Sequence, residues 1–323
     1  MMKKALVVGI NNYPNIPLDG CINDAREVAK VIRKNENDTR NFYVELKEDV
    51  RTKDELLGAI SSLFKGKADI ALLYFSGHGF IDERGGYLVT PDYTEYSLGV
   101  SMSDILLFAN QSKCENKIII LDCCHAGSMG TVPSSGIQAS IIGDGITLLT
   151  ASKGDESAME VDGHGVFTNL LLEALKGGAA NLQGKITPGS VYAYIDQALG
   201  AWDQRPVFKT NITKFVSIRD VYPSVEYEDL KIIEKCFSHP SVHMKLDPSY
   251  EFTNDESIEH EFLEPFADKE HVEIFKVLQK LEGVGLVKPV EEEHMYFAAM
   301  NSKACMLTPL GQYYWQLLKE GRI

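Results

Sequence analysis

Short uninterrupted runs of hydrophobic residues alternate along the chain with segments in which hydrophobic positions recur every three or four residues. Such runs are typical of strands buried on both faces of a sheet, and such spacing is typical of helices with one buried face. The runs predict strands at residues 5–10, 42–46, 69–75, 117–122 and 146–151. The spacing predicts helices at residues 21–34, 53–64, 102–110, 166–176 and 188–199. This alternation predicts an α/β fold with a mostly parallel sheet and helices on both faces.

The pattern changes after DVYPSVE (220–226), which divides the chain into domains of residues 1–222 and 223–323. In the second domain it predicts helices at 226–237 and 269–281, short strands at 286–290 and 294–299, and a last helix starting at Thr308-Pro309. This succession resembles a winged-helix domain, so we expect a small α+β domain with a regulatory or interaction role. Four of its apolar residues are expected in its core: Phe275, Leu278, Tyr313 and Trp315.

Charge and composition narrow the function classes. The chain of 323 residues has a net charge of −14, which argues against a nucleic-acid partner. Residues 223–323 hold 10 Lys and Arg against 19 Asp and Glu, so the acidity is concentrated there. No apolar run approaches the roughly 20 residues of a bilayer span, and the opening MMKKALVVGI reads as a first buried strand. We therefore expect a cytoplasmic protein with no membrane partner.

Two polar sequences follow buried strands directly. Ser76-Gly77-His78-Gly79 comes after the strand at 69–75, and Cys123-Cys124-His125 after the strand at 117–122. In a parallel sheet both strand ends lie at one edge, where active sites gather. A histidine there can deprotonate a cysteine, so Cys124 is the candidate nucleophile and His78 the candidate base. Backbone N–H groups of Gly79 and Cys124 are assigned to an oxyanion hole.

Asp122 precedes Cys124 by two residues at the end of an extended strand, so the two side chains should lean the same way. A carboxylate beside the nucleophile suits a cationic substrate side chain, and a guanidinium best, because it forms paired hydrogen bonds.

LLYFSGHG followed by IIILDCCHAG resembles the catalytic core of the caspase-like peptidases, in their metacaspase and bacterial orthocaspase branch. GCINDA (20–25), TASKGDESAME and HGVFTNLLLEAL (150–175) are also similar, and the resemblance covers roughly residues 3–218. It implies a cysteine endopeptidase with His78 as base and Cys124 as nucleophile. It further implies a substrate pocket lined by Asp24, Asp122 and Ser76, cleavage of polypeptides after Arg or Lys, and action as a triggered effector.

The sequence departs from that branch in two ways. Calcium-dependent relatives carry aspartate clusters after the base and the nucleophile, whereas residues 80–91 hold only Asp82 and Glu83, with Asp92 and Asp144 further on. Calcium dependence is therefore in question, and neither a metal nor another cofactor is expected. Many relatives also cut themselves after the nucleophile's strand, but residues 118–152 contain no Lys or Arg. We expect a single-chain enzyme that is not activated by such a cut.

Other interpretations of the same residues remain. His164 is a rival base, Asp24 could cap its helix, Asp122 could accept an internal hydrogen bond, and the role of Ser76 is undecided. Cys123, Cys124 and His125 could bind a metal, although no C-x-x-C partner exists. Cys123 and the remaining cysteines (Cys21, Cys114, Cys236 and Cys305) are expected to be reduced, buried and small apolar residues.

Two functions of other classes compete with the peptidase. The first is a catalytically silent binding or scaffold protein on the same fold. The second is a DNA-binding regulator that uses the helix at 269–281. That helix offers Lys276 and Lys280 against Glu270 and Glu273, and the next turn carries glutamates 291–293, so phosphate repulsion disfavours it. We expect the acidic second domain to contact a protein partner instead.

Overall fold

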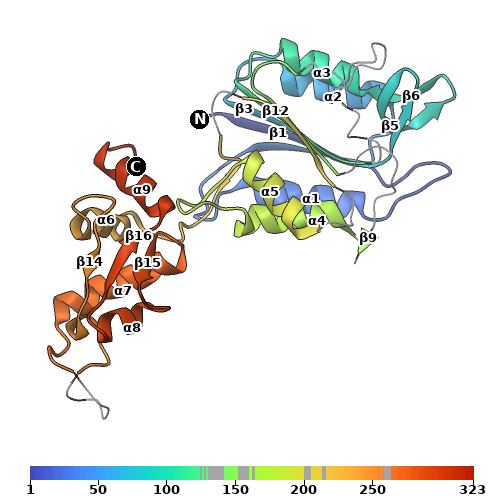
Figure 1. Ribbon diagram of the computed structural model, residues 1–323. Helices are drawn as coiled ribbons and strands as arrows, with labels where there is room; N and C mark the ends of the chain where they lie inside the picture. Colours follow the sequence, from blue (N-terminus) through green and yellow to red (C-terminus); the bar gives the residue numbers. More distant parts are fainter. Residues whose placement is uncertain are drawn as a thin grey trace. The chain divides into compact units, whose positions relative to one another are not determined.

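The computed structural model describes residues 1–123, 126, 129, 142–151, 160–161, 164–199, 205–212, 216–255, 257 and 263–323, and only the backbone at residues 160, 161 and 164. The chain forms two compact units, Met1–Tyr222 and Pro223–Ile323 (Figure 1). Among the helices that the structure describes, none is long and apolar enough to cross a lipid bilayer.

The first unit is built on a six-stranded sheet (Figure 1). Its strands, in spatial order, are β12 (Val207–Asn211), β8 (Ile146–Thr150), β7 (Asn116–Asp122), β3 (Ile70–Ser76), β1 (Lys3–Gly9) and β2 (Tyr43–Glu48). All neighbours are parallel except β12, which pairs with β8 in the antiparallel sense. The predicted α/β class with a mostly parallel sheet is confirmed.

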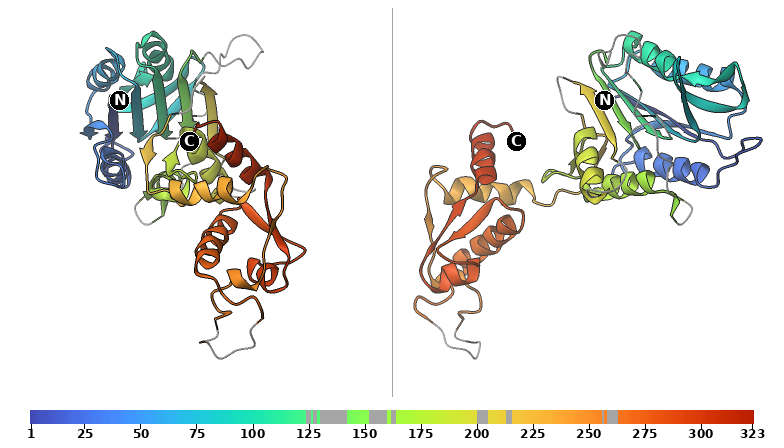
Figure 2. Two further views of the ribbon diagram at one scale, coloured as in Figure 1. Left: turned by 90° about the vertical axis from the view of Figure 1, so that its left-hand side faces the viewer. Right: turned by 45° about the vertical axis from the view of Figure 1, so that its right-hand side comes forward.

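Helices cover both faces of this sheet, as predicted, and Figure 2 shows the same layers from two further sides. One face carries α1 (Cys21–Arg33), α4 (Val166–Glu173), the π-helical continuation Ala174–Gly178 and α5 (Pro188–Leu199). The other face carries α2 (Lys53–Phe64) and α3 (Met102–Gln111). Successive side chains of β1 enter opposite layers: Ala5 and Val7 pack on the α1 side, Leu6 and Val8 on the α2 side.

Several strands of the first unit are additions to the predicted set. A three-stranded antiparallel sheet follows His78, formed by β4 (Gly79–Asp82), β5 (Gly85–Thr94) and β6 (Ser97–Ser101). Two short ladders pair β9 (Glu160–Val161) with β10 (His164–Gly165) and β11 (Lys185–Ile186) with β13 (Arg219–Asp220). The edge strand β12 was not predicted either.

The second unit combines helices with a small antiparallel sheet in the order β14–β16–β15. Its elements are α6 (Tyr227–Cys236), β14 (Met244–Lys245), the 3₁₀ turn η3 (Pro248–Tyr250), α7 (Lys269–Gly283), β15 (Val287–Val290), α8 (Met295–Met300), β16 (Ala304–Leu307) and α9 (Pro309–Lys319). The strand predicted at 294–299 is wrong, because these residues form α8 and the strand pairing with β15 is β16. The start of α9 is confirmed: the Thr308 hydroxyl accepts a hydrogen bond from the Gly311 N–H.

Burial tests the expected core residues. Cys21, Cys114, Cys123 and Cys305 are buried and reduced, as expected, whereas Cys236 is reduced but only half-buried. In the second unit Phe275 and Leu278 are buried, but Tyr313 is 53% exposed and was wrongly placed in the core. Trp315 is half-buried, with its indole N–H donating to the Phe237 carbonyl oxygen.

Candidate active site

Three neighbouring strands end level with one another at one edge of the main sheet. In the register of β1, β3 and β7, Gly9 lies beside Ser76, and Ser76 lies beside Asp122. His78 follows the end of β3 by two residues, and Cys124 follows β7 by two residues. Cys124 and His125 lie outside the residues that the structure describes. The sheet therefore brings the segments that carry the predicted base and nucleophile to adjacent positions.

Tyr13, in the segment after β1, holds His78 in place. The His78 backbone N–H donates to the Tyr13 hydroxyl at 3.1 Å, and the two rings meet edge to face with centroids 4.6 Å apart. The same hydroxyl lies 3.3 Å from the Val89 carbonyl oxygen and donates to it. Burial raises the pKa of the Tyr13 phenol well above its ordinary value, so the donor proton is retained. A side chain at Gly77 would collide with this hydroxyl, because its Cβ would lie 2.6 Å away.

The hydrogen bond of the His78 ring determines which ring nitrogen carries the proton of the neutral imidazole. Its Nε2 atom lies 2.7 Å from the Ile16 carbonyl oxygen. A carbonyl oxygen can only accept, so the proton of the neutral imidazole must reside on Nε2. The lone pair is therefore on Nδ1, which leaves that atom as the one able to take a proton from a thiol.

Two buried carboxylates meet at Gly165, and we call them the acidic pair. Asp24 comes from the first turn of α1 and is 1% exposed, and Asp122 comes from the end of β7 and is 6% exposed. The Gly165 N–H donates to Asp24 Oδ2 at 3.3 Å. A Cβ atom at Gly165 would lie 2.8 Å from Asp122 Oδ2 and 3.5 Å from Asp24 Oδ2, so a side chain there would press on both carboxylates.

Thr168, on the first turn of α4, orients Asp122. Its hydroxyl donates to Asp122 Oδ2 at 2.6 Å and also lies 2.6 Å from the Tyr74 hydroxyl, which can donate to it. Tyr74 is fully buried, and burial together with the negative charges of Asp122 and Asp24 holds the pKa of its phenol well above the ordinary value. The chain Tyr74–Thr168–Asp122 therefore directs the Thr168 hydroxyl proton at the carboxylate.

The remaining predicted residues are placed as follows. Ser76 is 2% exposed and, by strand alternation after Phe75, faces the same side of the sheet as Tyr74 and Asp122. Gly79 starts β4, opposite Leu88 of β5. The side chain of the rival base His164 lies outside the described residues, as does the Cys124 backbone assigned to the oxyanion hole. Cys123 belongs to the core on the α2 side, which confirms its expected position.

Two of the acidic residues considered for calcium, Asp82 and Asp92, bind protein groups. Asp82 binds the Arg84 guanidinium at 2.6 Å, and these hydrogen bonds lower the pKa of the Asp82 carboxyl. Asp92 accepts from the Lys53 N–H and from the Thr90 hydroxyl. Within the described residues, no group of three or more His, Cys, Asp or Glu side chains is arranged to hold a metal ion.

Sequence comparison defines the class of protein to which this fold and edge geometry belong. The family profile described as "Caspase domain" matches residues 2–216, about two thirds of the chain. The chain therefore belongs to the caspase-domain family.

The curated relatives are metacaspases. Metacaspase-2 of Trypanosoma brucei brucei is 27% identical over 161 residues, covering 42% of this chain and 46% of that protein. Metacaspase-3 of Trypanosoma cruzi (strain CL Brener) is 23% identical over 182 residues, covering 49% and 50%. The chain thus spans about half the length of the curated relatives it matches.

Two solved structures are similar to this chain. Protein GSU0716 from Geobacter sulfurreducens is 20% identical with a TM-score of 0.47, covering 68% of this chain and 98% of that one. Caspase-1 from Spodoptera frugiperda is 13% identical with a TM-score of 0.48, covering 68% and 91%.

Proposed function

We propose that this chain is a cysteine endopeptidase that cleaves polypeptides after Arg, and less well after Lys, with a Cys124–His78 dyad. The observation that carries the proposal is the pairing of two features at one sheet edge. His78 has its Nδ1 lone pair available because Nε2 is bound to the Ile16 carbonyl. The acidic pair of Asp24 and Asp122 lies at the same edge, beside Gly165.

In the proposed reaction the Cys124 thiol gives its proton to His78 Nδ1, and the thiolate attacks the scissile carbonyl carbon. The backbone N–H groups of Gly79 and Cys124 stabilise the resulting oxyanion. Collapse of the tetrahedral intermediate breaks the C–N bond, His78 returns the proton to the leaving amine, and a thioester remains on Cys124. A water deprotonated by His78 then hydrolyses the thioester, releasing the acid product and restoring the thiol.

The acidic pair determines the residue on the amino side of the cut. A guanidinium can bind two carboxylates from different directions at once, whereas a lysine ammonium is a single compact charge. Ser76 faces the same side of the sheet as Asp122 and adds a hydroxyl to this proposed pocket. A substrate aspartate would meet two negative charges there and be rejected.

The role of the second unit is proposed from its charge. Its net excess of nine acidic residues favours a protein partner over nucleic acid. Two of the three lysines of α7 are engaged in ion pairs, Lys276 with Glu273 and Lys280 with Asp229, so they are poor candidates for phosphate contacts. We assign this unit to recruitment or restraint of a triggered effector peptidase that works as a single chain.

Fluorogenic peptides ending in Arg, Lys or Asp test the proposal, with and without calcium. Cleavage of the Arg peptide should be lost in Cys124→Ala and in His78→Ala, and kept in Cys123→Ala, the matched control for the neighbouring core cysteine. Cleavage of the Asp peptide alone would refute the acidic pocket. If no peptide is cleaved, the protein is treated with a peptidyl-arginine chloromethyl ketone, which alkylates a reactive cysteine. Labelling at Cys124 supports the peptidase, and no labelling favours the silent scaffold.

A further inference from the structure

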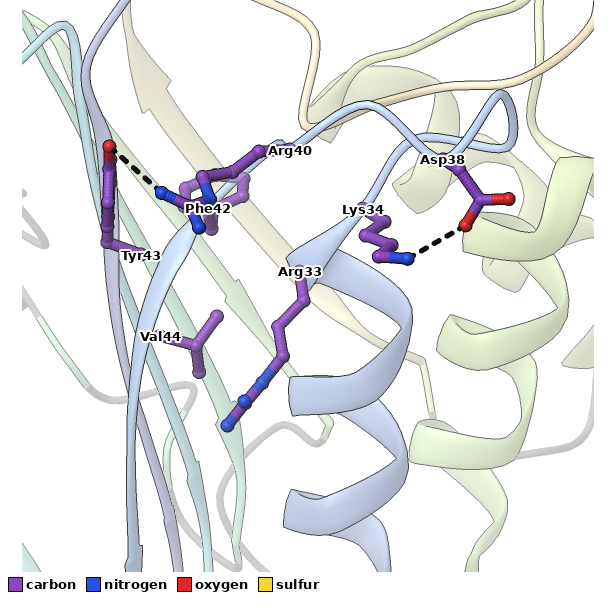
Figure 3. A pocket seen from close by; sticks show the side chains of 7 residues that line it. All are labelled: Arg33, Lys34, Asp38, Arg40, Phe42, Tyr43 and Val44. Atoms are coloured by element: carbon purple, nitrogen blue, oxygen red, sulfur yellow. Dashed lines mark hydrogen bonds and ion pairs between the residues drawn. The ribbon is translucent and has the colours of Figure 1, made fainter.

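A groove runs between α1 and the edge strand β2, on the side of the first unit away from β12. Two adjoining hollows form it, and both include Arg33 and Lys34 in their lining. Figure 3 shows Arg33 reaching from α1 across the hollow toward Val44 of β2, with Arg40 above it. We call this the α1–β2 groove, bounded by the outer face of α1 and by residues 38–48.

The groove is cationic in an acidic protein. Its lining holds five Lys and Arg side chains against two carboxylates, whereas residues 1–222 hold 22 Lys and Arg against 27 Asp and Glu. The carboxylates neutralise only two of the cations: Glu48 pairs with Arg26 at 2.7 Å and Asp38 with Lys34 at 2.9 Å.

A third cation, Lys30, pairs with Glu27 at 3.3 Å, so Arg33 and Arg40 are the two left for a ligand. Arg33 forms no ion pair with any residue that the structure describes. The Arg40 guanidinium lies 5.0 Å from the centre of the Tyr43 ring and donates weakly to its hydroxyl at 3.4 Å, and no carboxylate in the described part of the chain binds it. A positive charge without a counter-ion is therefore concentrated at the middle and at one end of the groove.

The floor and wall of the groove are suited to an extended chain. Among the described residues, β2 pairs with β1 alone, so its outer row of backbone N–H and C=O groups is open to pairing. Val44 and Leu46 face the groove with Ala29 of α1, which gives it an apolar floor. The charged residue Lys47 points to the other side of the sheet, where it pairs with Glu55 of α2.

We propose that the α1–β2 groove binds an extended acidic peptide segment of a partner protein, which adds a strand to β2. Backbone hydrogen bonds to β2 hold the segment, its apolar side chains contact Val44 and Leu46, and its carboxylates bind Arg33 and Arg40. The geometry favours a peptide over nucleic acid because an open strand edge recognises peptide backbone, and the acidic remainder of the unit repels a phosphate chain. This site does not depend on the proposed peptidase activity.

The test uses the full chain carrying Cys124→Ala, so that no probe is cleaved. The probe is a fluorescein-labelled peptide as long as β2 in which valine and glutamate take turns at every second position, with threonine between them, so that both kinds of side chain face α1. Its binding is followed by fluorescence anisotropy. Arg33→Glu should weaken binding by about tenfold or more, the loss expected for a charge-assisted hydrogen bond. Arg51→Glu, at an exposed arginine outside the groove, should leave binding within about twofold.

Two further probes separate the contributions. The same peptide N-methylated at alternate residues should bind far more weakly, because it cannot complete the backbone hydrogen bonds with β2. The same peptide with lysine in place of glutamate should not bind, because its charge matches that of Arg33 and Arg40. Arg40→Glu gives a second variant should Arg33→Glu fail to fold. Three results would each overturn the proposal. The N-methylated peptide could bind as tightly as the unmodified one, or neither arginine variant could change binding. Oligothymidylate could also bind more tightly than the peptide and lose that binding in Arg33→Glu.

Discussion

The Nε2 atom of His78 lies 2.7 Å from the carbonyl oxygen of Ile16, and this one contact decides which nitrogen can accept a proton. Ile16 belongs to the segment between β1 and α1, so the proposed base is oriented by a part of the chain far from it in sequence. Because a backbone carbonyl supplies the contact, no substitution of the Ile16 side chain removes it directly. The neighbouring Tyr13 offers a side chain that can be altered.

Tyr13→Phe should lower kcat/KM and stability together. The change leaves the His78 N–H and the Val89 carbonyl without the hydroxyl they share, and the loss of such buried hydrogen bonds costs about 1–3 kcal/mol. Chemical denaturation measures the stability and fluorogenic Arg peptides measure the activity. Tyr96→Phe, at an 82% exposed tyrosine, should change neither. Full activity in Tyr13→Phe would show that the hydroxyl does not position the base.

Asp122→Asn and Asp24→Asn should each reduce kcat/KM for Arg peptides by at least about tenfold, because each removes one anion from the acidic pair. The double variant should lose less than the product of the two effects, since both carboxylates act on one guanidinium. Asp54→Asn, at an exposed aspartate of α2, is the matched control. Wild-type kinetics in both single variants would remove the acidic pair from the pocket.

Thr168→Val should weaken Arg-peptide binding and destabilise the first unit by about 1–3 kcal/mol, because it leaves the buried Tyr74 hydroxyl without its partner. Thr168→Ser keeps the hydroxyl and should retain most of both properties. The comparison is made by KM and by unfolding midpoint. If Thr168→Ser were as impaired as Thr168→Val, the methyl group rather than the hydroxyl would be responsible.

Thiol alkylation should separate the proposed nucleophile, Cys124, from the buried cysteines. Burial raises the pKa of the Cys305 thiol to about 12 and that of Cys236 to about 11. At pH 8 the thiolate fraction is therefore roughly one in ten thousand at Cys305 and one in a thousand at Cys236. Peptide mapping after brief iodoacetamide treatment should find Cys124 modified first, and modification of Cys236 and Cys305 should rise only as the pH approaches their pKa values. Early modification of Cys305 would contradict its burial.

The sequence predicts the main sheet well because its strands are covered on both faces, and full burial demands uninterrupted apolar runs such as IALLYF in β3. The sheet of β4, β5 and β6 lacks that constraint: buried residues occur only in its middle, the rest are partly or fully exposed, and glycines interrupt it, so no long apolar run marks it. The segment MYFAAM misled for a different reason. Its aromatic residues favour a strand, but burial of Met295, Ala298 and Ala299 follows the helical spacing of three and four.

The sequence predicts the positions of candidate site residues that follow strand ends. It does not predict contacts that depend on the path of the loops across the sheet. His78, Asp122 and Ser76 could be placed because consecutive parallel strands end at a common edge. Tyr13, Thr168 and the Ile16 carbonyl were missed, because their roles require the path of the segment after β1 and the packing of α4 on β3. A hint was present in Tyr13, an aromatic residue in a polar segment directly after a buried strand.

The meeting of Asp24 and Asp122 at Gly165 has a consequence for redesign. The three residues come from the start of α1, the end of β7 and the entrance to α4, which are separate segments of the chain. Replacing one carboxylate with arginine would leave the other facing an acidic substrate and would give the new side chain a neutralising neighbour. Inverting the charge selectivity therefore requires coordinated substitutions in distant segments, which makes the proposed preference for basic residues resistant to change by single mutations.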